Sequence, residues 1–296
     1  MLRPVHDDSV PDFELVRSSD GTYVAARSLS EEGPGLPLLV VNAVGADLSP
    51  WRRALTDVAR TRPVITWDHR GMHDSGPPAG GRLEPSAHAE DALAVLDHHG
   101  IDRCAAVAWS NGGRIALELA AGSPHRVAGI ALVCAAYGQP FERFVSKLEP
   151  GALLPGVAGA AVHAAPLLEP AYRALAAWPE LPGVLRQAGL IGPTADTEAL
   201  GGLMRAVARC DLRRLLRAYE ELTRRGEGGL PARTVQPALL VAGGRDQVVS
   251  LTLMREIAEE LPAARLEVYD DATHFLPIEY PARLSDDLRA FLATLE

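Results

Sequence analysis

The chemistry of this sequence centres on Ser110, which lies between two segments of different character. Residues 104–109 form a short apolar run typical of a buried strand, and residues 112–122 have apolar side chains one helical turn apart. The small residues Ala108 and Gly112, two positions before and two after the serine, permit a tight, strained turn. Such a turn lifts the hydroxyl clear of the sheet and aims a helix N-terminus at the group it attacks. The segment predicts a nucleophile elbow and a serine-dependent enzyme.

A serine hydroxyl needs a base to take its proton, and a third group must orient that base. Of nine histidines, His274 lies in the loop after the last predicted strand, and loops at the carboxyl ends of parallel strands are where such sheets place their sites. His98 and His99 end a predicted helix, where a cation commonly caps the C-terminus. We therefore predict that His274 is the general base.

The acid is expected at the end of another strand, and Asp246 follows the apolar run at residues 238–241. A buried carboxylate there can accept the imidazole hydrogen bond and stabilise the imidazolium. Asp246 could instead cap the helix that begins near Ser250, although Ser250 is itself a good N-cap residue. Asp270 and Asp271 are rival acids, but they precede His274 so closely that we expect them to shape its loop.

The elements that must position these residues alternate along the chain. Residues 12–17 and 22–29 predict an opening hairpin around a Ser-Asp-Gly turn. Further strands are predicted at residues 38–41, 64–67, 104–109, 129–134, 238–241 and 266–269, and helices at about 50–60, 86–98, 112–122, 251–261 and 280–294. Unbroken apolar strands between helices indicate an α/β fold with a mostly parallel, eight-stranded sheet flanked by helices.

The alternation breaks at residues 137–236, a segment of helical stretches punctuated by proline and glycine. So long an excursion is not a bare loop in a compact domain. We predict an inserted helical cap at 137–236, on a core made of residues 1–136 and 237–296. An apolar roof would suit a bulky apolar substrate group, although its residues could equally pack the cap on the core; the candidates are Leu153, Leu154, Leu167, Leu168, Leu175 and Trp178.

Together these motifs resemble the alpha/beta-hydrolase superfamily over nearly the whole chain, with Ser110, Asp246 and His274 in the family's order. The resemblance implies that the backbone N–H groups of Val44 and Asn111 form the oxyanion hole. It also implies that Asp68 and Arg70, in an Asp-His-Arg-Gly turn, are scaffold residues.

Two positions depart from the family pattern. Ala108 stands at the first, usually glycine, position of the elbow, where only a small side chain is needed. Asn42 and Ala43 stand where the family usually has His-Gly, in the loop before Val44. Ala43 adopts glycine-only backbone angles only at a cost of roughly 1 kcal/mol or more, and Asn42 could replace the histidine as an anchor of the loop. A shifted oxyanion hole is therefore a possibility that the sequence leaves open.

Composition limits the other function classes. The chain of 296 residues is 47% hydrophobic, enough for a large core, and its net charge of −9 offers no basic stripe for nucleic acid. The three cysteines lie far apart, which favours free thiols. We expect no cofactor, no metal site, no secretory signal and no membrane span, and thus a cytoplasmic protein; arginine in place of almost all lysine suggests a GC-rich bacterial genome.

These observations predict a serine hydrolase that cleaves a small-molecule carboxylic ester, lactone or thioester through an acyl-enzyme. The altered oxyanion loop keeps a second reading open: C–C bond hydrolysis, acyl transfer or cyclisation in natural-product metabolism. A third reading is a ligand-binding protein without turnover. The sequence leaves the substrate and the oligomeric state open.

Overall fold

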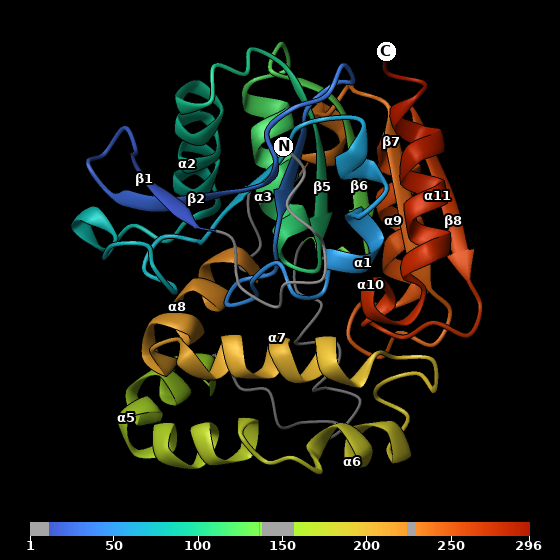
Figure 1. Ribbon diagram of the computed structural model, residues 1–296. Coiled ribbons are helices and arrows are strands. Elements are labelled where there is room, and N and C mark those ends of the chain that lie inside the picture. The colour runs from blue at the N-terminus through green and yellow to red at the C-terminus, as the bar shows by residue number, and fades with distance from the viewer. Residues whose placement is uncertain (1–11, 136, 138–156, 224–228) are drawn as a thin grey trace.

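The computed structural model describes residues 12–135, 137, 157–223 and 229–296. Its core is an eight-stranded sheet with strand order β1-β2-β4-β3-β5-β6-β7-β8 (Figure 1). The strands are β1 (Phe13–Arg17), β2 (Tyr23–Ser30), β3 (Leu38–Val41), β4 (Val64–Trp67), β5 (Cys104–Trp109), β6 (Val127–Val133), β7 (Ala238–Gly243) and β8 (Ala264–Tyr269). The β1–β2 hairpin is antiparallel and β2 pairs antiparallel with β4, whereas strands β3 to β8 are parallel to one another. The predicted mostly parallel sheet is confirmed.

Both faces of the sheet are buried, which is why its central strands read as unbroken apolar runs. In β3, Leu39 and Val41 join the hydrophobic cluster on one face, and Leu38 and Val40 join the cluster on the other. Helices α2 (Pro85–His98), α3 (Gly112–Gly122) and α9 (Leu251–Glu260) contribute to the first cluster. Helices α1 (Arg52–Leu55), α10 (Leu276–Glu279) and α11 (Pro281–Leu292) contribute to the second.

The C-terminal helix differs from its predicted bounds of 280–294. The chain instead forms α10 and α11, separated at Tyr280, which has the non-helical angles φ −132° and ψ 50°. Pro281 explains the break, because the proline ring disfavours helical angles at the preceding residue and suits the first position of a new helix. The predicted helix at 50–60 is likewise shorter, comprising α1 and a 3₁₀ turn at Val58–Arg60.

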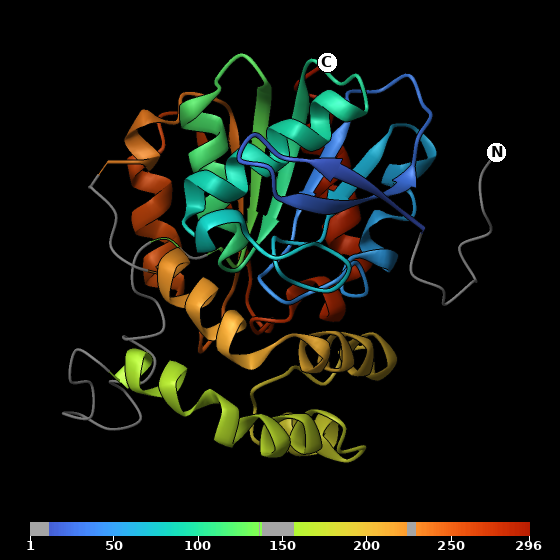
Figure 2. The same ribbon diagram turned by 90° about the vertical axis from the view of Figure 1, so that its left-hand side faces the viewer.

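A helical region is inserted between β6 and β7, as predicted. Its described helices are α5 (Val157–Ala176), α6 (Leu181–Gln187), α7 (Thr197–Arg209) and α8 (Leu212–Thr223). In both views it lies below the sheet, at the ends of the parallel strands, with α7 and α8 nearer the core and α5 and α6 farther out (Figures 1 and 2). Helix α8 contacts α3, and α5 packs on α7 and α8. Among the described helices, none is long and apolar enough to cross a membrane.

Candidate active site

The predicted elbow joins β5 to α3 in the middle of the sheet. Ser110 has a φ of 55°, in the left-handed region that non-glycine residues enter at a cost of about 1–3 kcal/mol. Gly112 allows α3 to start against the neighbouring loop, since a Cβ there would lie 2.6 Å from the Val41 carbonyl oxygen and closer still to that of Asn42. The strained turn and the close approach together place the Ser110 hydroxyl beside the loop that follows β3.

Three side chains from distant parts of the sequence meet at this point. His274 Nε2 lies 3.0 Å from Ser110 Oγ, and His274 Nδ1 lies 2.9 Å from Asp246 Oδ2. Ser110 is 8% exposed and His274 7%, and the Asp246 side chain is fully buried. A neutral imidazole donating from Nδ1 to Asp246 presents Nε2 as the acceptor for the serine hydroxyl. The geometry brings together the residues that the sequence predicted as nucleophile, base and acid.

The Asp246 carboxylate is fixed through its second oxygen. Asp246 Oδ1 accepts hydrogen bonds from the backbone N–H groups of Val248 (2.7 Å) and Val249 (2.8 Å). The N-cap of α9 is Ser250, whose hydroxyl oxygen accepts from the Leu253 N–H. Asp246 therefore orders its own loop and leaves Oδ2 for His274. The rival acids Asp270 and Asp271 are both exposed.

The His274 loop is held by Trp109, a residue whose role sequence reasoning missed. Its indole N–H donates to the His274 carbonyl oxygen at 2.9 Å, and its ring lies 5.7 Å from the imidazole, centre to centre. A buried indole N–H usually finds an acceptor, so a tryptophan next to the serine was the available signal. Gly243 also matters, because a Cβ there would lie 2.6 Å from the Thr273 carbonyl oxygen.

A buried carboxylate, Glu279, ties the same loop to the inserted helical region. It accepts hydrogen bonds from the Thr273 N–H at 2.7 Å and from the Thr273 hydroxyl. Its Oε1 also accepts from the Gly192 N–H at 2.7 Å. Glu279 is 4% exposed. One side chain on α10 therefore satisfies donors from the histidine loop and from the segment between α6 and α7.

The loop after β3 carries Val44, one of the two residues expected to supply oxyanion donors. Its N–H donates to the Asn111 side-chain oxygen at 2.9 Å. The Asn42 side chain does anchor this loop, donating from Nδ2 to Thr66 Oγ1 at 3.2 Å. His69 adds a second anchor through Nε2, which lies 2.9 Å from the Asn42 carbonyl oxygen. Burial lowers the pKa of His69 to about 4, so its ring is neutral and donates this bond.

The residues that the resemblance implied to be scaffold lie in buried ion pairs. Asp68 pairs with Arg27 at 2.9 Å, and Arg70, fully buried, pairs with Asp91 at 2.6 Å and with Asp20 at 2.8 Å. These pairs fix the turn that carries His69, and through it the loop of Val44.

The three cysteines are free and buried. Burial, with Asp246 nearby, raises the pKa of the Cys134 thiol well above its usual range. Its sulfur, an Asp246 oxygen and a His274 ring nitrogen all lie within 4.8 Å of one another. Among the described residues, these three form the group whose side chains are close enough to share a metal ion. Spacing in the sequence did not reveal this cluster. Asp246 and His274 already bond to each other within it, and Cys134 donates to the Thr273 carbonyl oxygen at 3.7 Å.

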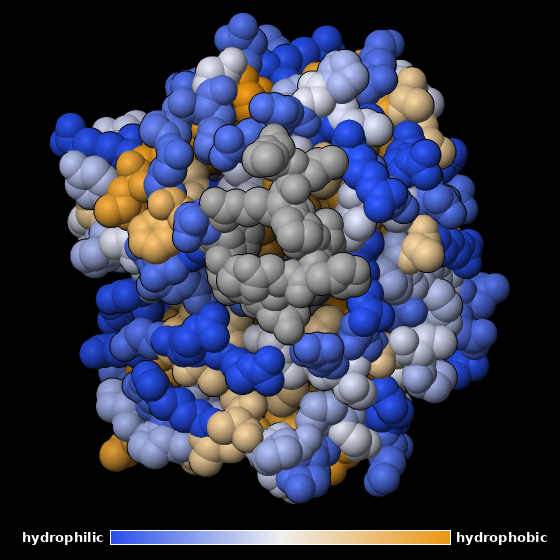
Figure 3. All heavy atoms as spheres, viewed as in Figure 1, coloured by the Kyte–Doolittle hydropathy of each residue, from blue (hydrophilic) through white to orange (hydrophobic). Residues whose placement is uncertain are grey.

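The expected apolar roof was wrong for the residues that the structure describes. Leu167 is 85% exposed, and Leu168, Leu175 and Trp178 are about half exposed, consistent with their place on and just after α5, in the outer layer. Apolar atoms are visible on the lower surface of the molecule, where this region lies (Figure 3). The proposed roof residues Leu153 and Leu154 lie outside the described residues. An apolar side chain that does reach the site region is Leu215 of α8, which packs on Gly45.

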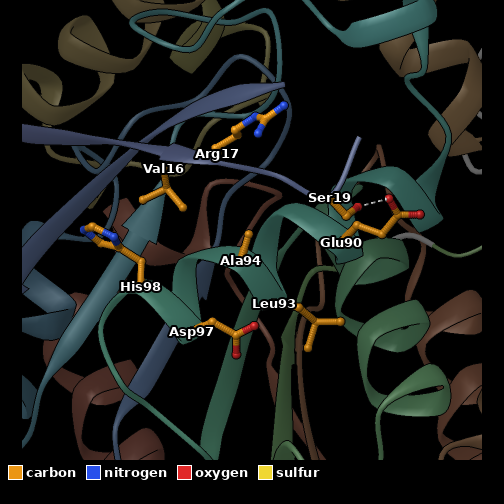
Figure 4. A pocket seen from close by; sticks show the side chains of 8 residues that line it. All are labelled: Val16, Arg17, Ser19, Glu90, Leu93, Ala94, Asp97 and His98. Atoms are coloured by element: carbon orange, nitrogen blue, oxygen red, sulfur yellow. Dashed lines mark hydrogen bonds between the residues drawn. The ribbon is translucent and has the colours of Figure 1, made fainter. Parts of the chain in front are cut away.

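A separate depression lies at the β1 edge of the sheet, between the hairpin and α2 (Figure 4). Arg17, Glu90, Asp97 and His98 are among its lining residues, and the Ser19 hydroxyl donates to Glu90 at 2.6 Å. None of the triad residues lines it.

Comparisons with known proteins identify relatives in sequence and in fold. The chain is 28% identical over 273 residues to the dihydrolipoyllysine-residue acetyltransferase component of an acetoin cleaving system of Pseudomonas putida, covering 89% of this chain but only 65% of that protein. It is 26% identical to a 2-hydroxymuconate semialdehyde hydrolase of Pseudomonas sp. strain CF600, covering 90% of each. A solved structure described as the N-acyl homoserine lactone degrading enzyme Est816 superposes with a TM-score of 0.72 at 25% identity, covering 94% of this chain and 100% of the other.

The profile of the alpha/beta hydrolase fold matches residues 37–281, from the strand before the oxyanion loop to the start of the last helix. That span includes the elbow, the acid loop and the histidine loop. The chain belongs to the alpha/beta hydrolase fold family.

Proposed function

We propose that this protein is a serine hydrolase that cleaves a carboxylic ester, lactone or thioester through an acyl-enzyme. The observation that carries the proposal is the continuous chain from Ser110 Oγ through His274 to Asp246, with contacts of 3.0 Å and 2.9 Å. A hydroxyl bonded to an oriented imidazole is an activated nucleophile.

In the proposed reaction, Ser110 Oγ attacks the carbonyl carbon while its proton passes to His274 Nε2. Asp246 stabilises the imidazolium, and the N–H groups of Asn111 and Val44 stabilise the negative oxygen of the tetrahedral intermediate. His274 then protonates the leaving alcohol or thiol. Water, deprotonated by the same histidine, attacks the acyl-enzyme and releases the acid.

Two observations support the proposed substrate class. The structural relative named for N-acyl homoserine lactones makes a lactone a reasonable test substrate. Leu215 and Val44 are apolar side chains at the oxyanion loop, which favours an apolar acyl group. We also propose that residues 137–236 act as the cap over a core of residues 1–136 and 237–296.

The test compares wild type with Ser110→Ala against esters, lactones and thioesters of graded size. A fluorophosphonate probe should label wild type at Ser110 and leave the variant unlabelled, with turnover lost and the melting temperature retained. Full turnover of the best substrate by Ser110→Ala would refute the covalent mechanism.

A second candidate keeps the fold and changes the reaction to C–C bond hydrolysis, acyl transfer or cyclisation. It is favoured by the Asn42-Ala43 loop and by relatives named for a semialdehyde and for acetyl transfer. Asn42→His should then raise simple esterase activity and lower the native activity; unchanged activities would count against it. A ligand-binding protein would instead bind its ligand tightly in calorimetry and release no product.

A further inference from the structure

One of the two expected oxyanion donors, the Val44 N–H, is already hydrogen-bonded in the structure. The Val44 N–H donates to Asn111 Oδ1 at 2.9 Å, and both residues are buried. The backbone N–H of Asn111 has no acceptor among the described residues. The backbone N–H of Asn111 is therefore free among the described residues. The N–H of Val44 is covered by the side-chain carbonyl of Asn111.

The loop of Val44 has several anchors besides the bond to Asn111. The loop is anchored by the Asn42 side chain on Thr66 and by the ring of His69 on the Asn42 carbonyl oxygen. The Ala46 N–H closes a turn onto the Ala43 carbonyl oxygen at 2.9 Å. His73 Nε2 lies 3.1 Å from the Gly45 carbonyl oxygen. These contacts fix the backbone on both sides of Val44.

From this arrangement we infer that the Asn111 carboxamide is an internal occupant of the oxyanion hole, which the substrate carbonyl must displace. The inference rests on the proposed function, because it takes Ser110 to attack a carbonyl group. Asn111 thus contributes twice: its backbone N–H is a donor, and its side chain covers the other donor until substrate arrives. The Val44 N–H becomes available to the substrate when this side chain moves away from it.

The Asn111 carboxamide in the oxyanion hole makes the hole bind the tetrahedral intermediate better than the ground-state substrate. Asn111 Oδ1 is a neutral carbonyl oxygen, the same kind of acceptor as a ground-state ester carbonyl, so exchanging one for the other gains little. A tetrahedral oxyanion is charged, and its hydrogen bonds are roughly twice as strong. Displacement is therefore favoured mainly in the transition state, where binding accelerates the reaction. Between turnovers the carboxamide also satisfies a buried N–H.

The experiment measures the affinity of phenylboronic acid. Its boron forms a bond with Ser110 Oγ, the serine proton passes to His274, and the resulting anionic boronate presents an oxygen to the oxyanion hole. Asn111→Ala and Asn111→Leu remove the occupant and keep both backbone donors, so both should bind the boronate about three- to tenfold more tightly than wild type. Asn111→Asp keeps the shape but adds a negative charge, and should bind it about tenfold more weakly. Gln187→Ala, which removes an exposed carboxamide on α6, is the matched control and should bind as wild type does.

In wild type, the Val44 amide signal in a ¹⁵N–¹H spectrum should move downfield when the boronate binds, because a charged acceptor replaces a neutral one. Equal or weaker boronate binding by both Asn111→Ala and Asn111→Leu would overturn the inference, since the bond would then be either idle or needed to organise the loop. The proposed function fails separately: in that case wild type itself gives no tetrahedral ¹¹B signal that Ser110→Ala abolishes.

Discussion

The indole N–H of Trp109 donates a hydrogen bond to the carbonyl oxygen of His274 at 2.9 Å, across 165 positions of sequence. Trp109 is the last residue of β5 and directly precedes Ser110. The residue next to the proposed nucleophile thus holds the backbone of the proposed base, so the distance from the serine to the imidazole is fixed from both sides.

Trp109→Phe should therefore lower activity more than it lowers stability. It removes the N–H donor and keeps most of the ring, which costs about 1–2 kcal/mol of unfolding free energy. A small displacement of His274 should reduce kcat about tenfold to a hundredfold. Denaturant unfolding and steady-state kinetics measure the two effects. Trp178→Phe, at a tryptophan 44% exposed on the inserted region, is the matched control and should change neither quantity appreciably.

A second prediction concerns Glu279, whose carboxylate accepts hydrogen bonds from the N–H groups of Thr273 and Gly192. Glu279→Gln puts an NH₂ group against one of these N–H donors and should lower the unfolding free energy by about 1–3 kcal/mol. It should also lower kcat, since the histidine loop loses a fixed point. Glu259→Gln, at an exposed position of α9, removes the same charge and serves as the control. Equal effects of the two substitutions would mean that the buried bridge does not matter.

The three residues proposed for catalysis could be predicted from sequence because each follows a strand of the sheet. The strands before Ser110 and Asp246 are buried on both faces and are therefore easy to recognise as unbroken apolar runs. Strand β8, before His274, is a partly exposed edge strand that contains an arginine and a glutamate. Ser110, Asp246 and His274 each follow a strand or its loop in the family's order. Trp109 and Glu279 were missed because the contacts of Trp109 with His274 and of Glu279 with Gly192 arise from packing between segments far apart in the chain.

The apolar roof failed for a related reason. Helical periodicity identifies an apolar stripe, but it does not say whether the helix lies in the inner or the outer layer of the inserted region. Leu167 and Leu168 belong to α5, which packs on α7 and α8. Only the three-dimensional arrangement separates these layers.

Stability should depend on pH through two buried histidines, His69 and His88, whose rings lie 5.0 Å apart. Burial lowers the pKa of His69 to about 4 from its usual 6.5 and holds that of His88 well below 6.5. At pH values below the usual histidine pKa of 6.5 and above the lowered pKa in the folded protein, the unfolded chain binds more protons than the folded one. The unfolding free energy therefore falls as the pH decreases from 6.5 towards 4. A histidine that is protonated in the unfolded chain and neutral in the folded one contributes a slope of at most roughly 1.4 kcal/mol per pH unit.

His88→Phe should flatten this slope, when the unfolding free energies at several pH values are compared with the value at pH about 8, above the titration of both groups. His125→Ala, which removes an exposed histidine, should leave the slope unchanged. A slope in His88→Phe as steep as in wild type would assign the acid sensitivity to other groups.

Two glycines at opposite ends of α3 give the last prediction. At Gly112 a Cβ would clash with the carbonyl oxygens of Val41 and Asn42, whereas at Gly122 it would meet nothing within 4 Å. Gly112→Ala must push the elbow away from the oxyanion loop, so we expect a loss of about 1–3 kcal/mol in stability and a large loss of kcat. Gly122→Ala makes the same chemical change at the end of the same helix and should be neutral or stabilising, by up to about 1 kcal/mol. If Gly112→Ala retains the kcat of wild type, the close approach of the elbow to the loop after β3 does not position the proposed oxyanion donors.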